Sequence, residues 1–317
     1  MERVLITGAT GFVGSALCAA LEQRGVGCRR ALRAGTGAGQ NDSVVGDIGP
    51  HTDWQAALEG ISSVVHLAAR THVMRESAAD PLAAYREINV EGTRRLAEAA
   101  AAAGVRRFVF LSSIKVNGER TGLLPFGESD EPHPEDAYGI TKLEAEQVLK
   151  RIAAESQMRV TILRPPLVYG PGVKGNFLAL MGAVRKGVPL PLGSVDNRRS
   201  LVHVGNLASA VVACLDNERA AGQTFLISDG EDLSTPELIR RLATGLGTRP
   251  RLYRCPVRLL RAAGALLGRR AQVARLTDSL QVDSARIRQT LGWTPPVSTE
   301  EGLADTARWF VAQAGGG

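Results

Sequence analysis

A glycine-rich turn near the start of the sequence constrains this chain more than any other feature. The turn, Gly8-Ala9-Thr10-Gly11-Phe12-Val13-Gly14, joins the apolar run at residues 3–7 to a helix-forming stretch that Gly25 ends. Glycines at this spacing allow a tight turn, close approach of the backbone to a pyrophosphate, and close packing of helix on strand. The unpaired N–H groups of the helix would face the phosphates. We therefore expect a dinucleotide site that includes Gly8, Thr10, Gly11, Phe12, Val13 and Gly14; the alternative is an ordinary glycine-rich turn.

Apolar runs alternate with helix-forming stretches through the first half of the chain. The expected strands lie at 3–7, 26–33, 44–48, 63–67, 107–111 and 160–163, and the expected helices at 12–24, 81–103 and 137–156. This alternation predicts an α/β fold, a Rossmann-type doubly wound parallel sheet over residues 1–165. Prolines and glycines become frequent after Arg164. We expect 166–314 to form mainly a smaller C-terminal substrate-binding lobe that includes a strand at 224–227, with some segments returning to the first domain, and 315–317 to be a tail.

Composition excludes several classes of protein. Hydrophobic residues make up 44% of the 317 residues and no apolar run approaches the ~20 residues of a membrane span. The chain has no signal-peptide pattern and its four cysteines lack metal-site spacing, so we expect a cytoplasmic protein without a metal. Aromatic residues are only 4% and the net charge of +6 is scattered, which suits an anionic small substrate better than nucleic acid. The helical run Leu259-Leu260…Leu266-Leu267 is expected to be buried on the second lobe rather than to form a membrane-surface stripe.

The second expected strand ends where a dinucleotide fold reads the adenine ribose. An acidic residue there binds a free 2′-hydroxyl, whereas an arginine suits a 2′-phosphate. This chain has Leu32-Arg33, which favours NADP over NAD unless Arg33 is simply solvated. Asp47 and Ile48 would lie against the adenine. The small residues of Leu67-Ala68-Ala69 would let a flat cofactor pass.

Three residues in two segments have the chemistry of an acid–base site. Tyr138 and Lys142 lie one helical turn apart and therefore project from one helix face. An ammonium beside a phenol is expected to lower the phenol pKa toward the working range. Ser113 follows a strand, and parallel strands end at one crevice, so the three side chains can meet there. Taken alone, the Tyr-x-x-x-Lys pair would be an exposed helix pair, and His66 and His203 are expected to be structural.

The chain resembles extended short-chain dehydrogenases/reductases of the NAD-dependent epimerase/dehydratase family, which act on nucleotide sugars. The resemblance rests on motifs that occur in the family's order: TGATGFVG, Asp47-Ile48, HLAAR, Asn89-Val90-Glu91-Gly92-Thr93, the Ser–Tyr–Lys set, RPP…YGPG and RSLVHV. It implies that Ser113 binds the sugar C4 oxygen, Tyr138 transfers the proton, and Asn89 supports the site. It also implies that Lys142 and Pro165 contact NAD(P)(H), and that the chain forms a homodimer through the helices at 81–103 and 137–156.

Ile114 and Lys115 occupy the positions at which the family's 4,6-dehydratases carry an Asp-Glu pair. Isoleucine transfers no proton, and a lysine without a local acid partner is a poor base at neutral pH, so dehydration is not expected. The stretches RPPLVYGPGVKGNF and FLISDGEDLSTPEL resemble those of 4-reductases for UDP-4-keto-6-deoxy-N-acetylhexosamines. The resemblance thus implies hydride transfer at sugar C4, as a 4-ketoreductase or as a UDP-sugar 4-epimerase. A non-catalytic NADP-sensing regulator is the alternative from another class.

The resemblance also carries over substrate contacts. Asn176 and Arg199 would bind the diphosphate of a UDP-sugar, and the backbone of Leu190 and Leu192 would meet the uracil. Three positions depart from the family's pattern. They are Leu32 for an acidic residue, Leu167 for an asparagine, and Leu280 for a tyrosine that limits the C2 substituent.

Overall fold

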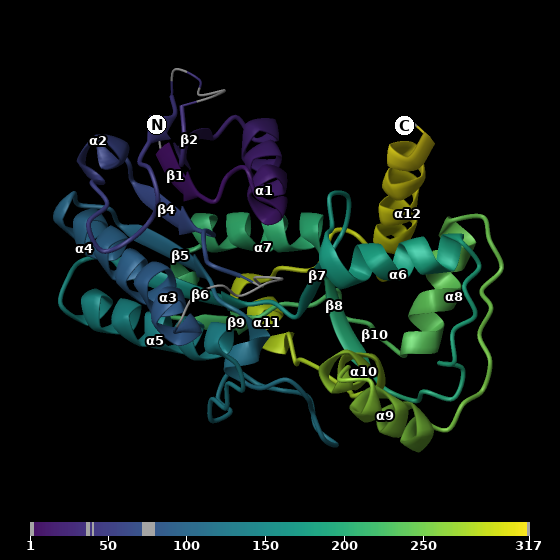
Figure 1. Ribbon diagram of the computed structural model, residues 1–317. Helices are drawn as coiled ribbons and strands as arrows, with labels where there is room; N and C mark the ends of the chain where they lie inside the picture. Colours follow the sequence, from purple (N-terminus) through teal and green to yellow (C-terminus); the bar gives the residue numbers. More distant parts are fainter. Residues whose placement is uncertain (1–2, 36–38, 40, 72–79, 316–317) are drawn as a thin grey trace.

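The computed structural model describes residues 3–35, 39, 41–71 and 80–315 (Figure 1). Seven strands form one parallel sheet in the order β3-β2-β1-β4-β5-β6-β9. Their bounds are β1 (Arg3–Thr7), β2 (Gly27–Leu32), β3 (Ser43–Val44), β4 (Ser63–His66), β5 (Arg107–Leu111), β6 (Arg159–Arg164) and β9 (Thr224–Leu226). The order reverses between β1 and β4, so a crevice opens at the carboxyl ends of these two strands. The predicted doubly wound fold is confirmed.

Two strands differ from the expectation. The strand predicted at 44–48 is only two residues long, because Gly46 has a φ of 74° and turns the chain away from the sheet. The strand predicted at 224–227 belongs to the large sheet and not to the second lobe, since β9 pairs parallel with β6.

Helices cover both faces of the sheet. On one face, α1 (Phe12–Gln23) packs on α7 (Val204–Asp216), and on the other α4 (Thr93–Ala102) packs on α5 (Ala137–Ala154), as Figure 1 shows. The helix expected over 81–103 is interrupted: α3 (Pro81–Arg86) and α4 are joined by a π-helical turn, η1 (Glu87–Gly92). The remaining short helices of this domain are α2 (Gln55–Leu58), η2 (Ile114–Val116), η3 (Glu218–Ala220) and α11 (Ala285–Leu291).

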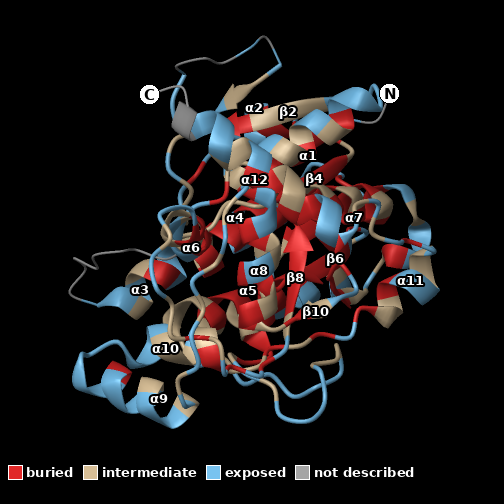
Figure 2. Cartoon of the chain, turned by 90° about the vertical axis from the view of Figure 1, so that its right-hand side faces the viewer, coloured by how far each residue is buried: buried red, intermediate tan, exposed pale blue. Residues whose placement is uncertain are grey.

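The second lobe has its own small sheet, β10-β8-β7, and its own apolar core. Its elements are β7 (Leu167–Tyr169), α6 (Gly175–Arg185), β8 (Arg199–His203), β10 (Asp232–Leu233), α8 (Thr235–Gly245), α9 (Val257–Leu266), α10 (Arg270–Thr277) and α12 (Thr299–Gly315). The buried strand β8 runs through the middle of this lobe (Figure 2).

The expected burial of the leucine run in α9 is wrong for most of that helix. Leu259, Leu266 and Leu267 are 61%, 88% and 74% exposed, and only Leu260 packs on the lobe's core. Figure 2 shows α9 mostly in the colour of exposed residues. Nevertheless, none of the described helices is long and apolar enough to cross a membrane.

Candidate active site

A cavity of about 220 Å³ lies where the large sheet meets the second lobe. Ser113, Tyr138, Asn176 and Arg199 all line it, although they come from four separate elements. The other lining residues are Ile114, Lys115, Glu119, Pro166, Leu167, Val168, Arg275 and Leu280. The structure therefore brings together the predicted serine–tyrosine pair and the two predicted diphosphate contacts.

The end of β5 positions Ser113. The N–H of Ser112 still donates to Leu163 of the next strand, and that of Ile114 donates to the carbonyl of Pro165. Ser113 then caps the short helix η2, where its Oγ accepts from the N–H of Lys115 at 3.3 Å. The hydroxyl can still donate, so a carbonyl oxygen in the cavity can receive its proton in a hydrogen bond.

The first turn of α5 positions Tyr138 against residues 112–117, which we call the serine turn. Asp136 caps this helix by accepting from the N–H of Gly139 at 2.8 Å. A Cβ at Gly139 would lie 2.8 Å from the carbonyl oxygen of Lys115, so only glycine lets the two segments approach this closely. The ammonium of Lys115 also pairs with the carboxylates of Asp136 and Glu119. The expectation that Lys115 lacks a local acid partner is thus wrong, because the fold brings two carboxylates to it.

Burial dominates the electrostatics of the tyrosine–lysine pair. It raises the pKa of Tyr138 above its ordinary value, with Asp136 and Tyr85 adding to the effect. Burial also lowers the pKa of Lys142 to about 7, which the carboxylate of Glu146 partly opposes. The predicted lowering of the phenol pKa by Lys142 is therefore not seen in this structure, because burial, Asp136 and Tyr85 all raise that pKa. Lys142 is poised to change its charge at neutral pH.

Asn89 lies in the π-helical turn and supports the site from behind. Its Oδ1 accepts from the N–H of Arg70 at 2.8 Å, and its Nδ2 donates to Arg70 O and to Thr141 Oγ1, both at 3.1 Å. It does not line the cavity. Asn89 therefore links η1 to α5, the helix that carries Tyr138. Turns of π-helix are frequent at functional sites.

A buried chain of hydrogen bonds connects Asn89 to the cofactor side through His66. The Thr93 hydroxyl donates to the carbonyl of Asn89, so it accepts from His66 Nε2 at 2.9 Å. His66 Nδ1 must then accept from the Thr7 hydroxyl at 2.6 Å, and Thr7 Oγ1 in turn accepts from Ala68 N. Burial lowers the pKa of His66 to about 3, so the imidazole stays neutral. His66 is a structural residue, as the sequence predicted.

A buried ion pair that the sequence pattern does not predict lies below Ser113. Glu146 receives two hydrogen bonds from Arg164, at 2.9 and 2.6 Å, and a third from Ser112 Oγ at 2.5 Å. Arg164 also donates to Asn117 Oδ1 at 2.9 Å. Glu146 follows Lys142 by one helical turn, and this spacing is the one feature of the sequence that places Glu146 on the helix face of the site. The network ties α5 to β6 and to both ends of the serine turn.

The glycine turn has the shape that a dinucleotide requires. Gly8 has a φ of 69°, and a Cβ there would lie 2.9 Å from Ala68 N, which places the turn against Leu67 and Ala68. A Cβ at Gly14 would lie 2.1 Å from the carbonyl oxygen of Gly8, so α1 starts directly on the turn. No side chain caps α1 at Gly11 and its first turn has no acidic residue. The residues present thus fit a bound pyrophosphate, and its binding here stays a prediction.

Two predicted adenosine contacts lie side by side. Arg33 Nε is 2.6 Å from Asp47 Oδ1, and both side chains are about four-fifths exposed. Ile48 touches η1, where a Cβ on Gly92 would lie 2.8 Å from its Cγ2. The three predicted adenosine contacts therefore lie close to one another, near the carboxyl end of β2 and the start of the η1–α4 junction.

The second lobe brings two arginines to the cavity. Burial lowers the pKa of Arg199, and Arg275 from α10 lowers it further. Arg199 Nη1 donates to the carbonyl of Asp278 at 3.0 Å. Two cations facing one cavity are suited to a diphosphate. Arg275 was missed because nothing in the sequence shows that α10 reaches the cavity.

Leu190 and Leu192 do not join this group. The N–H of Leu190 donates to Arg251 O at 2.8 Å and its carbonyl accepts from Tyr253 N at 3.1 Å, while Leu192 is buried in the lobe's core. The Leu190 N–H is therefore already used in chain pairing, and the uracil contact stays a prediction.

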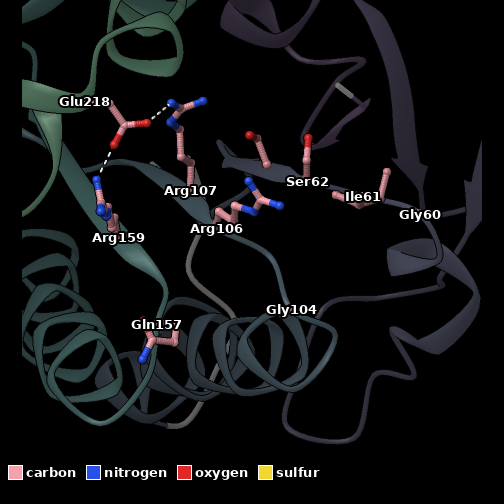
Figure 3. Close-up of a pocket in the computed structure, with 10 residues that line it drawn as sticks. Gly60, Ile61, Ser62, Gly104, Arg106, Arg107, Gln157, Arg159 and Glu218 are labelled. Carbon is pink, nitrogen blue, oxygen red and sulfur yellow. Dashed lines mark hydrogen bonds and ion pairs between the residues drawn. The ribbon is translucent and has the colours of Figure 1, made fainter. Parts of the chain in front are cut away.

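A larger cavity of about 770 Å³ lies at the opposite, amino-terminal ends of β4, β5 and β6 (Figure 3). Its residues Arg107 and Arg159 both pair with Glu218, as the dashed lines in Figure 3 show. It contains no tyrosine, lysine or histidine among its lining residues, so it lacks a proton donor suited to neutral pH. No group of three possible metal ligands occurs in the described residues of the chain.

The chain is similar to a known protein family and to several characterised proteins. The NAD dependent epimerase/dehydratase family matches residues 4–228. UDP-glucose 4-epimerase of Vibrio cholerae is 46% identical over 316 residues, which cover 98% of this chain and 96% of that protein. GDP-6-deoxy-D-mannose reductase of Pseudomonas aeruginosa is 30% identical over 251 residues, covering 76% of this chain and 77% of the reductase. MoeE5 in complex with UDP-glucose and NAD superposes with a TM-score of 0.80 at 29% identity, over 99% of this chain and all of MoeE5.

Proposed function

This chain belongs to the NAD-dependent epimerase/dehydratase family, and we propose that it transfers hydride at C4 of a UDP-linked hexose, reducing a UDP-4-keto-6-deoxy-N-acetylhexosamine. The observation that carries the proposal is the cavity itself. Ser113 and Tyr138 line it together with Arg199 and Asn176, so an acid–base pair and two residues suited to a diphosphate share one cavity.

Each residue has a defined task in the reduction. The glycine turn at residues 8–14 would hold NAD(P)H, which would supply the hydride for C4 when bound. Tyr138 donates its phenolic proton to the C4 oxygen, which Ser113 holds by a hydrogen bond, so the ketone becomes an alcohol. Lys142, with a pKa of about 7, stabilises the phenolate until it regains a proton.

The lining of the cavity favours a deoxygenated sugar. Ile114, Pro166, Leu167, Val168 and Leu280 are apolar and offer no side-chain hydrogen bonds to sugar hydroxyls. A methyl group at C6 suits such a surface, whereas a hydroxymethyl group loses hydrogen bonds to water. Leu280 also leaves room for an N-acetyl group where a tyrosine would be larger.

A 4-epimerase is the second candidate, favoured by the 46% identity to UDP-glucose 4-epimerase. Such an enzyme uses the same residues but returns the hydride to the opposite face of C4. The purified protein should be incubated with UDP-4-keto-6-deoxy-N-acetylglucosamine, UDP-N-acetylglucosamine and UDP-glucose, with and without NADH or NADPH. Stoichiometric oxidation of reduced cofactor with the keto sugar supports the reductase. Interconversion of C4 epimers without net oxidation supports the epimerase, and no change in any sugar would refute hydride transfer at C4.

We propose NADP as the preferred cofactor, although the family's name and the solved relative MoeE5 point to NAD. The exposed pair between Arg33 and Asp47 is weak, about 0–1 kcal/mol, so Arg33 can turn to a 2′-phosphate at little cost. Arg33→Ala should weaken NADPH binding and leave NADH binding unchanged. Arg24→Ala, which removes another exposed arginine paired with an aspartate, is the control. An unchanged ratio of the two affinities in Arg33→Ala would exclude this role.

A further inference from the structure

One segment of the second lobe carries an unusual concentration of positive charge. Residues 238–277 include no aspartate or glutamate. Their arginines are Arg240, Arg241, Arg249, Arg251, Arg254, Arg258, Arg261, Arg269, Arg270 and Arg275. The segment therefore carries a formal charge of +10 in a chain whose net charge is +6, so the remaining residues together are negative.

Several of these charges are left uncompensated around α9 and α10. Arg261 pairs with Asp278, at 2.6 Å. By contrast, the side chains of Arg258, Arg269 and Arg270 are exposed and form no ion pair or hydrogen bond with any residue that the structure describes. A fixed group of free cations at one edge of a protein attracts an anionic surface.

The apolar side of α9 faces solvent. Leu259, Ala262, Ala263 and Leu266 are spaced as i, i+3, i+4 and i+7, and all four are exposed. Leu267, 74% exposed, extends this stripe by one residue. In a globular protein, a stripe with this spacing normally faces the core. Here the inward contacts come instead from Val257 and Leu260, which pack on the lobe's core, and from Gly264, which packs on Val273.

Helix α10 packs directly on α9. A Cβ at Gly264 would lie 2.5 Å from Val273 Cγ2, so the backbone of α9 lies against the Val273 side chain of α10. Leu276 anchors α10 on the lobe's core, next to Arg275, which lines the catalytic cavity. Figures 1 and 2 both place α9 at the periphery of the molecule.

We propose that the α9–α10 hairpin docks on an anionic lipid bilayer, with the leucine stripe at the headgroup boundary and the flanking arginines on lipid phosphates. A helix with leucines on one side and arginines around them has the composition of interfacial membrane helices. A second copy of the chain is a poorer occupant, because two identical basic segments would repel each other. The inference goes beyond the proposed function and does not depend on it. Through Arg275, docking would bring the mouth of the catalytic cavity close to the membrane.

The test is sedimentation of the full-length protein with vesicles of phosphatidylcholine, with and without phosphatidylglycerol. We expect binding only to the anionic vesicles, and release at high salt as the charges are screened. Arg269→Ser with Arg270→Ser should weaken binding ~30-fold, since each arginine near an anionic surface contributes about a factor of five. Leu266→Ser with Leu267→Ser should also release the protein. Both leucines are exposed, so their replacement needs no repacking.

A control is available on the other domain of the same chain. Val44 is also apolar and exposed, at 55%, and lies on β3, the outermost strand of the large sheet. Val44→Ser should leave vesicle binding intact. Absence of binding, equal binding to neutral vesicles, or equal loss in this control would overturn the proposal. The proposal would also fail if the protein were a dimer that the serine substitutions at Leu266 and Leu267 dissociate, and if neither the dimer nor the dissociated variant bound anionic vesicles.

Discussion

The ammonium nitrogen of Lys142 lies 4.0 Å from the centroid of the Phe110 ring, and the lysine side chain is almost completely buried. Phe110 belongs to the strand that ends at the serine turn, so this contact joins the two segments that supply Ser113 and Tyr138. The ring face replaces part of the hydration that the cation loses. The ring does not replace all of the lost hydration, because burial lowers the pKa of Lys142 to about 7.

Lys142 is therefore expected to lower the stability of the protein at neutral pH. Its pKa is about 7 in the folded chain and 10.5 ordinarily, so between these values the unfolded chain binds a proton that the folded chain does not. The free energy of unfolding should rise as pH increases from 7 toward 10.5 and level off below 7. Lys142→Met should remove this slope and raise the free energy of unfolding at pH 7 by about 2–4 kcal/mol. Urea unfolding at pH 7 and pH 9 measures both; a less stable variant, or an unchanged slope, would contradict the argument.

Tyr138→Phe should abolish turnover and preserve the fold. The ring remains to fill the site, but the proton donor is lost, and general acid catalysis of this kind contributes about 10²–10⁴ in rate. Cofactor affinity should stay within about twofold, because the phenol oxygen is not part of the glycine turn. Tyr253→Phe removes the same oxygen from a half-exposed tyrosine outside the cavity and should leave turnover intact. Turnover retained in Tyr138→Phe would mean that another group donates the proton.

The sequence could predict those parts of the site whose chemistry is local. The glycine turn, Tyr138 with Lys142, and Ser113 at the end of a strand each follow from short-range spacing, and the parallel sheet brings their segments to one edge. Arg199 could be matched by resemblance, and it does line the cavity. Arg275 could not, because its place depends on how α10 packs on the second lobe.

Most differences between the sequence-based predictions and the structure concern the direction in which a helix face points and the pairing of residues far apart in the chain. The spacing in α9 indicates an apolar stripe but not whether it faces the core, and here it faces solvent. Lys115 has no acidic neighbour before Glu119, and Asp136 reaches it only after the intervening loop folds back. Proximity to Lys142 predicts a lower pKa of Tyr138, but the sequence does not show that both groups are buried, and burial raises this pKa.

Gly14→Ala should damage both cofactor binding and stability. The new methyl group would lie 2.1 Å from a backbone oxygen, so the turn and α1 must separate. Overpacking against backbone costs about 1–3 kcal/mol or more. Gly182→Ala is the control in another helix: its Cβ meets nothing within 4 Å, and it should stabilise the chain by up to ~1 kcal/mol. Thermal unfolding and cofactor titration measure the stability and the cofactor affinity of the two variants. Equal values for both variants would show that the glycine turn is not tightly packed.

Glu146→Gln should destabilise the protein far more than Glu144→Gln, although both residues lie on α5 and pair with arginines. Glu146 and Arg164 are buried, so removing one charge leaves the other uncompensated, at about 3–5 kcal/mol. Glu144 and Arg86 are partly exposed, and their pair contributes about 0–1 kcal/mol. Chemical denaturation gives both differences. Similar losses in the two variants would mean that water reaches Arg164.

Lys115 is expected to position Tyr138 rather than to bind substrate. Its ammonium holds Asp136, the cap of α5, while its carbonyl packs on Gly139, so it fixes the distance between the serine turn and the tyrosine. Lys115→Met should lower kcat by about 10- to 100-fold, since displacement of reacting groups by about 1 Å has this effect. KM should change little, because Arg199 and Asn176 remain, and Lys115→Arg should restore most of the rate.

Two further observations separate positioning from substrate contact. With the positive charge gone, Asp136 raises the pKa of Tyr138 further, so the Tyr138 limb of the pH–rate profile should move to higher pH. Glu119, Arg199 and Arg275 are the other charged groups that line this cavity, and all three remain in the variant. Lys186→Met, which removes an exposed lysine after α6, should change neither kcat nor the profile. A rise in KM at constant kcat in Lys115→Met would instead assign Lys115 to the sugar or its diphosphate, because a group that binds ground state and transition state equally affects KM alone.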